Sequence, residues 1–360
     1  VEFVIELAAR LHTYGTTAQR LEGAITAVAT RLGLRCDPWS NPTGLILSFS
    51  DASRPETLAN TTQVIRLPPG EVDLRKLCEV DAIAEQVLRG DIGVSEAVAA
   101  LHALDRPLGR GDHLLSIAAF GLASAAIAVL LRSSWPDVAV SGGIGLLIGT
   151  LFALGAQRPR LAESLELIAA LLATLIAAAI ASFVVPLSLK TVIVASVIVL
   201  MPGMMLTNAV SELTSQHLVS GTARFAGAMA VLLKLAFGSM AASQVALLLG
   251  WSPLQYHDVP MLPGWTEWTA LLAAALAFAA LFKASWRDYP LVMAAVVIGS
   301  LVTRFAGLWL SSAASVFVAS VTITLLSNAY ARWANRPGAL IRVAGIILMV
   351  PGSVGFRGVS

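Results

Sequence analysis

Charged residues and cysteines are both scarce in this 360-residue chain. Asp, Glu, Lys and Arg together make up 13% of it, whereas a soluble domain carries about a quarter. Cys36 and Cys78 are too few for a disulfide framework and lack metal-ligand spacing, so no metal and no other cofactor is expected. No basic tract interleaved with aromatic residues is present. These shortages argue against disulfide scaffolds, metal sites and nucleic-acid partners.

Catalytic motifs are also missing from the first 112 residues, where most of the polar side chains lie. His12, Glu22, Ser48 and Asp51 are the residues from which a hydrolytic site could be assembled. No nucleophile elbow, phosphate loop or metal spacing accompanies them. A regulatory or assembly domain is the simpler interpretation, and the chain is not expected to be an enzyme. A membrane-anchored hydrolase remains an alternative.

Apolar residues, by contrast, are abundant. They make up 57% of the chain, and the mean hydropathy is +0.78, which is typical of a polytopic membrane protein. The charge is uneven, because 26 of the 46 Asp, Glu, Lys and Arg residues precede His113. We therefore expect a soluble domain over 1–112 and a membrane domain after it.

The soluble segment has the pattern of a small α+β domain. Apolar positions from Phe3 to Leu32 follow a helical spacing that Gly33 stops. The residues 34–51 predict a strand, a turn at Asn41–Gly44 with Gly44 at positive φ, and a second strand. A third apolar run covers 64–67, and two helices follow over 73–89 and 94–104.

Nine hydrophobic segments can be drawn after residue 112, and most have the ~20 residues that a membrane span needs. The basic residues of the connecting loops fall mainly on one side if the segments alternate across the membrane. This asymmetry places the soluble domain in the cytoplasm and the protein in the cell (inner) membrane as a multi-pass protein. The nine segments are 113–131, 138–155, 165–186, 190–207, 222–250, 267–283, 289–309, 311–331 and 339–351.

Two of these segments are broken by a Pro-Gly pair, at Pro202-Gly203 and at Pro351-Gly352. Proline cannot donate to the helical ladder, so such a break leaves backbone groups without partners at membrane depth. It is tolerated where protein or a water-filled cavity satisfies those groups. Paired breaks in two halves of a chain indicate the binding site of a transporter.

The two halves echo each other in sequence. Arg132–Asp137 resembles Lys283–Asp288, offset by 151 residues between Trp135 and Trp286, and the Pro-Gly pairs are offset by 149. We therefore predict an internal duplication, with a five-helix repeat over 113–250 and a second repeat over 251–360. An odd number of spans inverts the second repeat relative to the first. Its fifth helix would lie beyond the given sequence, so the natural chain is expected to continue.

Four polar residues near the first break are candidates for substrate or proton chemistry. Thr207 and Asn208 follow the break by about one turn and could bond the substrate, or could instead hold the broken helix together. Lys234 lies near the middle of its segment, where an ionisable residue is a functional candidate. It could balance a substrate carboxylate or couple protons, or form a structural ion pair with Glu212. Glu212 shares a helical face with Asn208 and could carry the proton, or sit solvated at the cytoplasmic mouth.

Several of these stretches resemble the bacterial threonine/serine exporter family. They are Gly15–Glu22, Asn41–Ser48, Gly90–Ala97, Met201–Leu213 and Val350–Gly358. The resemblance implies export of threonine and serine from the cytoplasm, driven by the proton motive force, by a ten-span protein with a cytoplasmic amino-terminal domain.

The expected function is therefore a secondary exporter working by alternating access, with threonine, serine, protons and the lipid bilayer as its partners. Homo-oligomerisation is left open, and a channel or receptor is a further alternative. The expected substrate-binding residues are Pro202, Gly203, Thr207, Asn208, Lys234, Pro351, Gly352 and Ser353, and the expected proton-coupling residues are Glu212 and Lys234.

Overall fold

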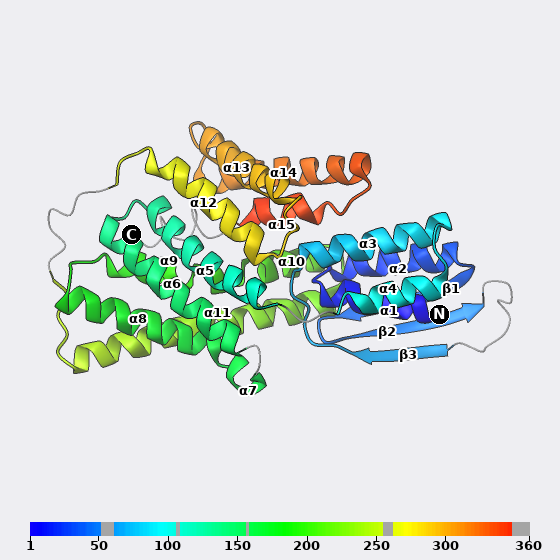
Figure 1. Ribbon diagram of the computed structural model, residues 1–360, viewed down its shortest axis with the longest axis horizontal. Coiled ribbons are helices and arrows are strands. Elements are labelled where there is room, and N and C mark those ends of the chain that lie inside the picture. The colour runs from blue at the N-terminus through cyan, green and yellow to red at the C-terminus, as the bar shows by residue number, and fades with distance from the viewer. Residues whose placement is uncertain (52–60, 106–108, 156–157, 255–261, 348–360) are drawn as a thin grey trace.

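The computed structural model describes residues 1–51, 61–105, 109–155, 158–254 and 262–347. An α+β part lies at one end of the molecule and a helical bundle at the other (Figure 1). The elements of the α+β part are α1 (Glu2–Thr13), α2 (Ala18–Arg31), β1 (Leu34–Asn41), β2 (Gly44–Asp51), β3 (Thr61–Arg66), α3 (Leu74–Arg89) and α4 (Val94–Ala103).

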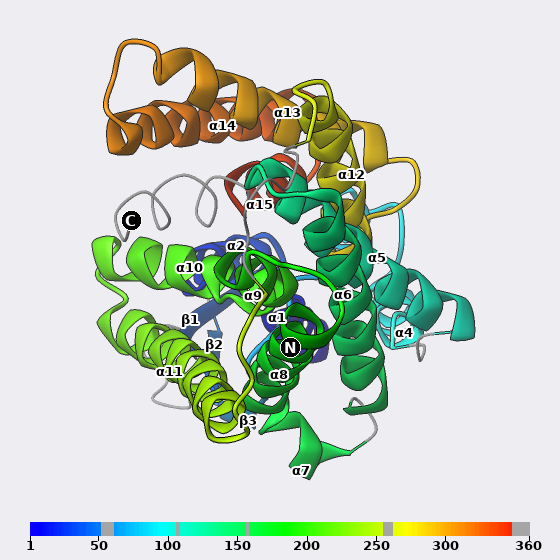
Figure 2. The same cartoon turned by 90° about the vertical axis from the view of Figure 1, so that its left-hand side faces the viewer.

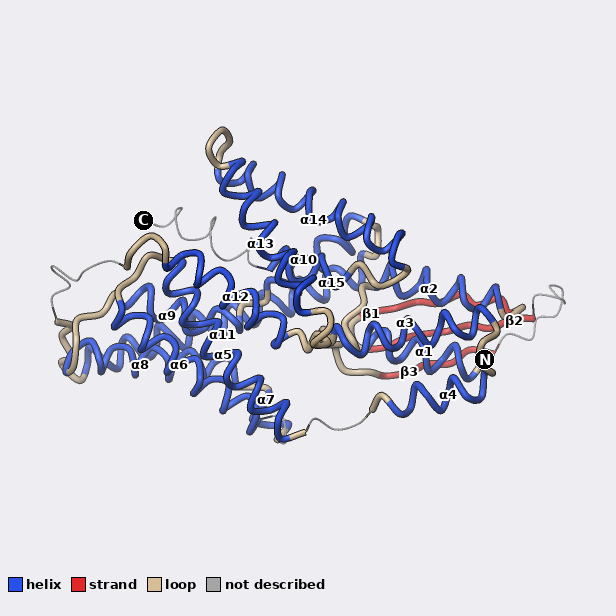
Figure 3. The backbone as a smooth tube through the Cα atoms, turned by 45° about the horizontal axis from the view of Figure 1, so that its top comes forward, coloured by secondary structure: helices blue, strands red, loops and turns tan. Residues whose placement is uncertain are grey.

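The three strands form one antiparallel sheet in the order β1-β2-β3, beside helices α1 to α4 (Figure 3). Along β2 the side chains of Leu45, Leu47 and Phe49 are buried, as the alternation of a half-buried strand requires. They join apolar residues of the four helices in a single core. The predicted strands and the two later helices are therefore present at nearly the predicted positions.

The structure differs from the prediction at Gly15 and at Gly44. The helical pattern over 3–32 is two helices, because the chain turns at Gly15 with φ of 82°. The predicted turn at Asn41–Gly44 exists, with the Asn41 side-chain oxygen accepting from the Thr43 amide at 3.0 Å. Gly44, however, does not have positive φ. A side chain there is excluded because a Cβ would lie 2.7 Å from the Ile65 carbonyl oxygen of β3.

The bundle is formed by helices that are mostly apolar along their whole length. In the part of the chain that the structure describes, six of them are long and apolar enough to cross a membrane, or seven if the bent α9–α10 pair counts as one span. The bundle elements are α5 (Arg110–Leu130), α6 (Trp135–Gly155), α7 (Pro159–Ala162), α8 (Leu165–Phe183), α9 (Leu189–Val197), the short η1 (Ile198–Leu200), α10 (Gly203–Thr214), α11 (Leu218–Leu248), α12 (Thr266–Leu281), α13 (Tyr289–Ala306), α14 (Ser312–Ala334) and α15 (Ala339–Ile347).

The protein is therefore a polytopic helical membrane protein, with two departures from the nine predicted segments. The segment 267–283 is the 16-residue α12, shorter than a typical span. The segment 339–351 is described only as far as Ile347. Seen along the bundle, α13 and α14 form a hairpin at its edge, while α10 and α11 lie on the opposite side of α15 (Figure 2).

The turns that end α5 and α12 have the same hydrogen-bond pattern. Arg132 and Lys283 both adopt positive φ, 58° and 53°. The Arg132 amide donates to Val129 at 2.9 Å, and the Lys283 amide donates to Ala280 at 3.0 Å. In both turns the next residue bonds five positions back, as in a Schellman motif. The two similar sequence segments therefore also share a turn conformation.

These two turns lie at opposite ends of the bundle. The Arg132 side chain reaches Glu267 at the start of α12, at 3.1 Å. The end of α12 instead meets the α+β part, where the Leu74 amide donates to the Phe282 carbonyl at 3.0 Å. Helices α5 and α12 therefore run in opposite directions.

Candidate functional site

The predicted break in the fourth hydrophobic segment is a bend between two helices. Helix α9 continues through η1 to Leu200, and α10 begins at Gly203 after a change of direction of 57°. Pro202 lacks an amide hydrogen, and the Gly203 amide donates to the Met201 carbonyl at 2.8 Å instead of to a helical partner. The α10 half-helix therefore starts within the bundle with its first-turn amides outside the α9 ladder.

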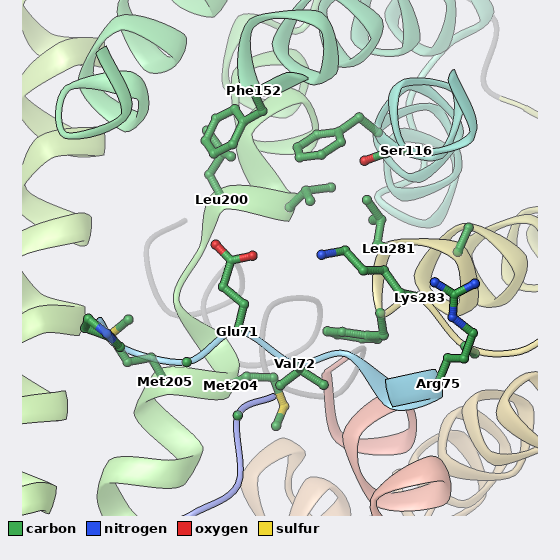
Figure 4. A pocket seen from close by; sticks show the side chains of 18 of the residues that line it. Glu71, Val72, Arg75, Ser116, Phe152, Leu200, Met204, Met205, Leu281 and Lys283 are labelled. Atoms are coloured by element: carbon green, nitrogen blue, oxygen red, sulfur yellow. The ribbon is translucent and has the colours of Figure 1, made fainter. Parts of the chain in front are cut away.

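A cavity of about 690 Å³ lies between the α+β part and the bundle. Its walls come from the 69–72 connection, the start of α5, the end of α6, the α9–α10 break, α11 and the end of α12. Figure 4 shows Phe152 and Leu200 at one end of it, and Glu71 and Val72 at the other. The cavity thus runs from the α+β part to the level of the break.

The wall beside the break is largely apolar. Leu200 precedes the break, Met204 and Met205 follow it, and all three line the cavity. The rings of Phe120 and Phe152 pack 5.7 Å apart near them. An apolar wall with a few polar groups is the usual composition of a small-molecule site.

Asn208 is the predicted binding residue that lines this cavity. Thr207 is not among the lining residues, and its hydroxyl donates to the Gly203 carbonyl one turn earlier, at 2.9 Å. Pro202 and Gly203 are buried at the bend itself, between lining residues. Pro351, Gly352 and Ser353 lie outside the described residues.

Lys234 does not meet Glu212, which was one of the alternatives that the sequence left open for it. Its ammonium donates to the Glu163 carbonyl at 2.7 Å and lies 3.5 Å from the Glu166 carboxylate. Helix α11 has 31 residues, about 46 Å at 1.5 Å per residue, and exceeds the ~30 Å hydrocarbon thickness. Lys234, near the middle of this helix, therefore lies beside the start of α8.

Glu212 is buried, so the interpretation that it is solvated at the cytoplasmic mouth is wrong. Its side chain is 0% exposed, and both carboxylate oxygens lie 3.0 Å from Nε of Arg224. The Ser220 hydroxyl donates to it at 2.7 Å. The amide of Ala18, in the α+β part, donates at 2.9 Å. Glu212 is not a cavity-lining residue, but Arg224 is.

The polar residues considered for a hydrolytic site have separate partners. His12 bonds the Pro68 carbonyl at 3.2 Å, and Glu22 accepts from the Ser40 amide and contacts His217 at 3.0 Å. Ser48 meets Thr62 at 3.4 Å. Within the described residues, no group of three or more His, Cys, Asp or Glu could hold a metal. The described contacts therefore support structural roles for His12, Glu22 and Ser48.

Charged residues that line the cavity, among them Arg224, Glu71 and Lys283, were not predicted from the sequence. Arg224 pairs with Glu212, while Glu71 and Lys283 line the cavity from opposite parts of the molecule. For Lys283 a signal existed, because it occupies the repeated turn and aligns with Arg132. For Glu71 the sequence offered none, since its neighbours in the cavity are distant along the chain.

Two family models match almost the whole chain. A model described as "Putative threonine/serine exporter" matches residues 2–246. A model described as "Threonine/Serine exporter, ThrE" matches residues 259–360. The boundary between the matches falls in the connection between α11 and α12.

Curated relatives from yeasts carry the name "Pheromone-regulated membrane protein 10". The protein from Pichia sorbitophila is 25% identical over 373 residues, which is 98% of this chain and 36% of the relative. Those from Eremothecium gossypii and Saccharomyces cerevisiae are 25% and 24% identical, again over 98% of this chain, and 48% and 46% of the relatives. The chain thus spans between about a third and a half of the length of these relatives.

No solved structure gives a significant match to this chain. The two family models together cover the α+β part, the broken helix and the described helices of the second half. The chain belongs to the threonine/serine exporter family.

Proposed function

We propose that this protein is a secondary transporter that exports threonine and serine across the cytoplasmic membrane. The proton motive force drives export, and the carrier works by alternating access. The family descriptions name the substrates, and the membrane-spanning helices provide the setting. On this proposal the soluble domain, 1–112, faces the cytoplasm, as the distribution of basic loop residues favours.

The observation that carries the proposal is the cavity that reaches the broken helix. It is walled by the α9–α10 break on one side and by charged residues of both signs on the other. A free amino acid is a zwitterion, so its site needs an anion-binding and a cation-binding group close together. The cavity of about 690 Å³ is large enough for a small amino acid with its water.

On this proposal, substrate contacts gather around the α10 half-helix. The side-chain amide of Asn208 bonds the substrate, and Met204 and Met205 of the first turn of α10 form an apolar wall beside it. Thr207 and the Pro202-Gly203 pair hold the half-helix in its bent position. We propose that Pro351, Gly352 and Ser353, the second Pro-Gly break in the sequence, also contribute to substrate binding.

Glu212 and Lys234 are the proposed proton-coupling residues. Lys234 is paired with Glu166, which lines the cavity, and Glu212 is paired with Arg224, which lines it too. A substrate or a conformational change that separates the two members of either ion pair leaves each charge to find a new partner or to change its protonation. Each pair therefore links the state of the cavity to a titratable side chain.

Alternating access rests on the proposed duplication of 113–250 and 251–360. The matching turns at Arg132 and Lys283, and the opposite directions of α5 and α12, support inverted repeats. Inverted repeats permit two conformations that exchange the exposed side of a central site.

Flux of labelled threonine and serine in proteoliposomes, with and without an imposed pH gradient, tests this function. We expect saturable, gradient-driven flux that Asn208→Ala and Lys234→Ala greatly reduce. Val210→Ala, on the exposed side of α10, and Lys190→Ala, at an exposed lysine, are matched controls that retain flux. Flux that neither saturates nor responds to the gradient would instead indicate a channel.

A further inference from the structure

Two oppositely charged side chains point into the cavity from different walls. Glu71 extends from the connection between β3 and α3, and Lys283 extends from the turn after α12 (Figure 4). Their charged ends face each other across the open space (Figure 4). In the described part of the chain, no ion pair within 4.0 Å joins Glu71 or Lys283 to another side chain.

The other acidic residues of the cavity have partners already. Glu166 faces Lys234 at 3.5 Å. Asp112 accepts from the Gly109 amide at 3.0 Å, where it caps α5. Glu71 is therefore the cavity carboxylate that remains available for a cationic ligand among the described residues.

The backbone around Glu71 is fixed by close contacts with the turn between α1 and α2. The Glu71 amide donates to the Thr13 carbonyl at 3.1 Å. The preceding Gly70 lies so close that a Cβ there would overlap the His12 carbonyl oxygen. Glu71 is thus presented from a firmly held segment rather than from a free loop.

The backbone of Lys283 is fixed as well. Lys283 sits at φ of 53° in the turn that ends α12. Its carbonyl accepts from the Arg75 amide at 3.2 Å, and the Phe282 carbonyl accepts from the Leu74 amide at 3.0 Å. These two bonds join the wall that carries Lys283 to the start of α3, three residues after Glu71. The separation of the two side chains is therefore set by backbone contacts.

We infer that Glu71 binds the ammonium group and Lys283 the carboxylate of the transported amino acid. This inference rests on the proposed function, because it assigns the substrate of the same cavity. The α-ammonium and α-carboxylate of an amino acid are attached to one carbon, so a compact zwitterion between the two side chains satisfies both. Among the described residues, Arg75 is the other arginine or lysine lining the cavity that has no ion-pair partner within 4.0 Å. Arg75 lies beyond Lys283 as seen from Glu71 (Figure 4).

One consequence is that the α+β part forms half of the substrate site. Glu71 belongs to that part, while Lys283 belongs to the bundle. The amino acid then binds at the contact between the two, and its release into the pathway requires that contact to change. The α+β part acts as a component of the carrier on this account.

Competition with two analogues of threonine separates the two roles. The protein is reconstituted in proteoliposomes, and threonine flux is inhibited by 3-hydroxybutanoate, which lacks the ammonium group, or by 1-aminopropan-2-ol, which lacks the carboxylate. We expect Glu71→Gln to raise the KM for threonine by about 10- to 100-fold, as expected for a lost charged hydrogen bond. It should also remove the preference for threonine over 3-hydroxybutanoate. Lys283→Gln should instead remove the preference over the amino alcohol.

Glu79→Gln and Arg287→Gln are the matched controls, because both side chains are exposed and neither lines the cavity. They should leave both preferences unchanged. An equal loss of affinity for both analogues in Glu71→Gln would indicate a structural role and overturn the inference. An unchanged KM for threonine in Glu71→Gln or Lys283→Gln would also overturn the inference. So would a preference for threonine over the amino alcohol that is lost in Arg75→Gln but kept in Lys283→Gln. Absence of threonine and serine flux in the unmodified protein would contradict the proposed function itself.

Discussion

The two ion pairs beside the broken helix differ in burial, and so in what they contribute to stability. The Glu212 side chain is 0% exposed and that of Arg224 is 9% exposed, whereas Lys234 and Glu166 are 39% and 23% exposed. Removing one member of a buried pair leaves an uncompensated charge away from water. In the partly exposed Lys234–Glu166 pair, water screens the attraction, and it solvates the remaining charge when one member is removed.

Glu212→Ala should therefore lower the free energy of unfolding by about 3–5 kcal/mol, measured by denaturant unfolding in detergent. Glu166→Ala should cost less than about 1 kcal/mol. The double change Glu212→Leu with Arg224→Met should recover much of the loss, because no buried charge then lacks a partner. Equal costs for Glu212→Ala and Glu166→Ala would show that burial does not distinguish the pairs.

The two thiols should react slowly while the protein is folded. Burial raises the pKa of both Cys36 and Cys78 to about 11, so the thiolate is a very small fraction at pH 7.5. Because the thiolate is the nucleophile, alkylation by iodoacetamide should be about 100-fold slower than in the denatured chain. Mass spectrometry of both peptides measures it. Equal rates in the two states would contradict the burial of these side chains.

His12 should make the α+β part less stable in acid. Burial lowers the pKa of His12 below its ordinary value of 6.5. The unfolded chain then binds the proton at a higher pH than the folded chain does, so the stabilising contribution is complete above about pH 6.5. That contribution is lost as the pH falls through the lowered pKa of His12 in the folded protein.

Amide hydrogen exchange between pH 5 and pH 7.5, corrected for its intrinsic pH dependence, measures that loss. His12→Gln should flatten the decline in acid. Gln86→Ala, at an exposed side chain of α3 that does not titrate, is the control and should leave the decline unchanged. An identical slope in the two variants would contradict the assignment to His12.

At the scale of elements, small residues let α5 and α6 pack closely. The small-residue spacing over 141–149 predicts close packing of this helix, without naming its neighbour. A Cβ on Gly145 would lie 2.8 Å from the Phe120 carbonyl, and one on Gly149 would lie 3.0 Å from Ile117 Cα. A Cβ on the neighbouring Gly143 would have nothing within 4 Å. Only one side of α6 therefore requires glycine.

Gly145→Val should destabilise the protein by about 1–3 kcal/mol, because backbone of α5 blocks the new side chain. Gly143→Val is the matched control and should change stability much less. Thermal unfolding of both variants in detergent provides the comparison. A similar loss for the two variants would show that the close approach of α5 and α6 does not limit side-chain size.

The elements themselves could largely be predicted, because hydropathy, strand alternation and Pro-Gly pairs are local signals. The contacts between them could not. The sequence offers Glu212 as a partner of Lys234, yet the Lys234 ammonium lies beside Glu163 and Glu166 at the start of α8. Gly44 was assigned a turn conformation, although the approach of β3 is what excludes a side chain there.

At the scale of the whole molecule, hydrogen bonds among the described residues join the α+β part to the bundle at places that include the following two. One is the elbow between α10 and α11, where Ala18 bonds Glu212 and Glu22 contacts His217. The other is the end of α12, where Leu74 bonds Phe282. The cavity lies between the two parts, so any movement of the α+β part changes its walls.

The sequence could not predict these contacts. The residues that meet are separated by 194 positions for Ala18 and Glu212, and 195 for Glu22 and His217. No local pattern carries information over such distances. Asn208 can be predicted from the sequence because it follows the Pro-Gly break. Glu71 can be recognised as a cavity residue only from the folded structure.

Substrate protection of a cysteine placed in the cavity wall tests most directly whether the cavity is the amino-acid site. Ser116→Cys, at a cavity-lining position with no proposed part in binding, is introduced with Cys36→Ser and Cys78→Ser, and the rate of maleimide labelling is measured in proteoliposomes with increasing threonine. We expect threonine and serine to slow labelling saturably, at concentrations near the KM for flux. Labelling that is unaffected by threonine, in a variant that still transports it, would show that the cavity is not the amino-acid site.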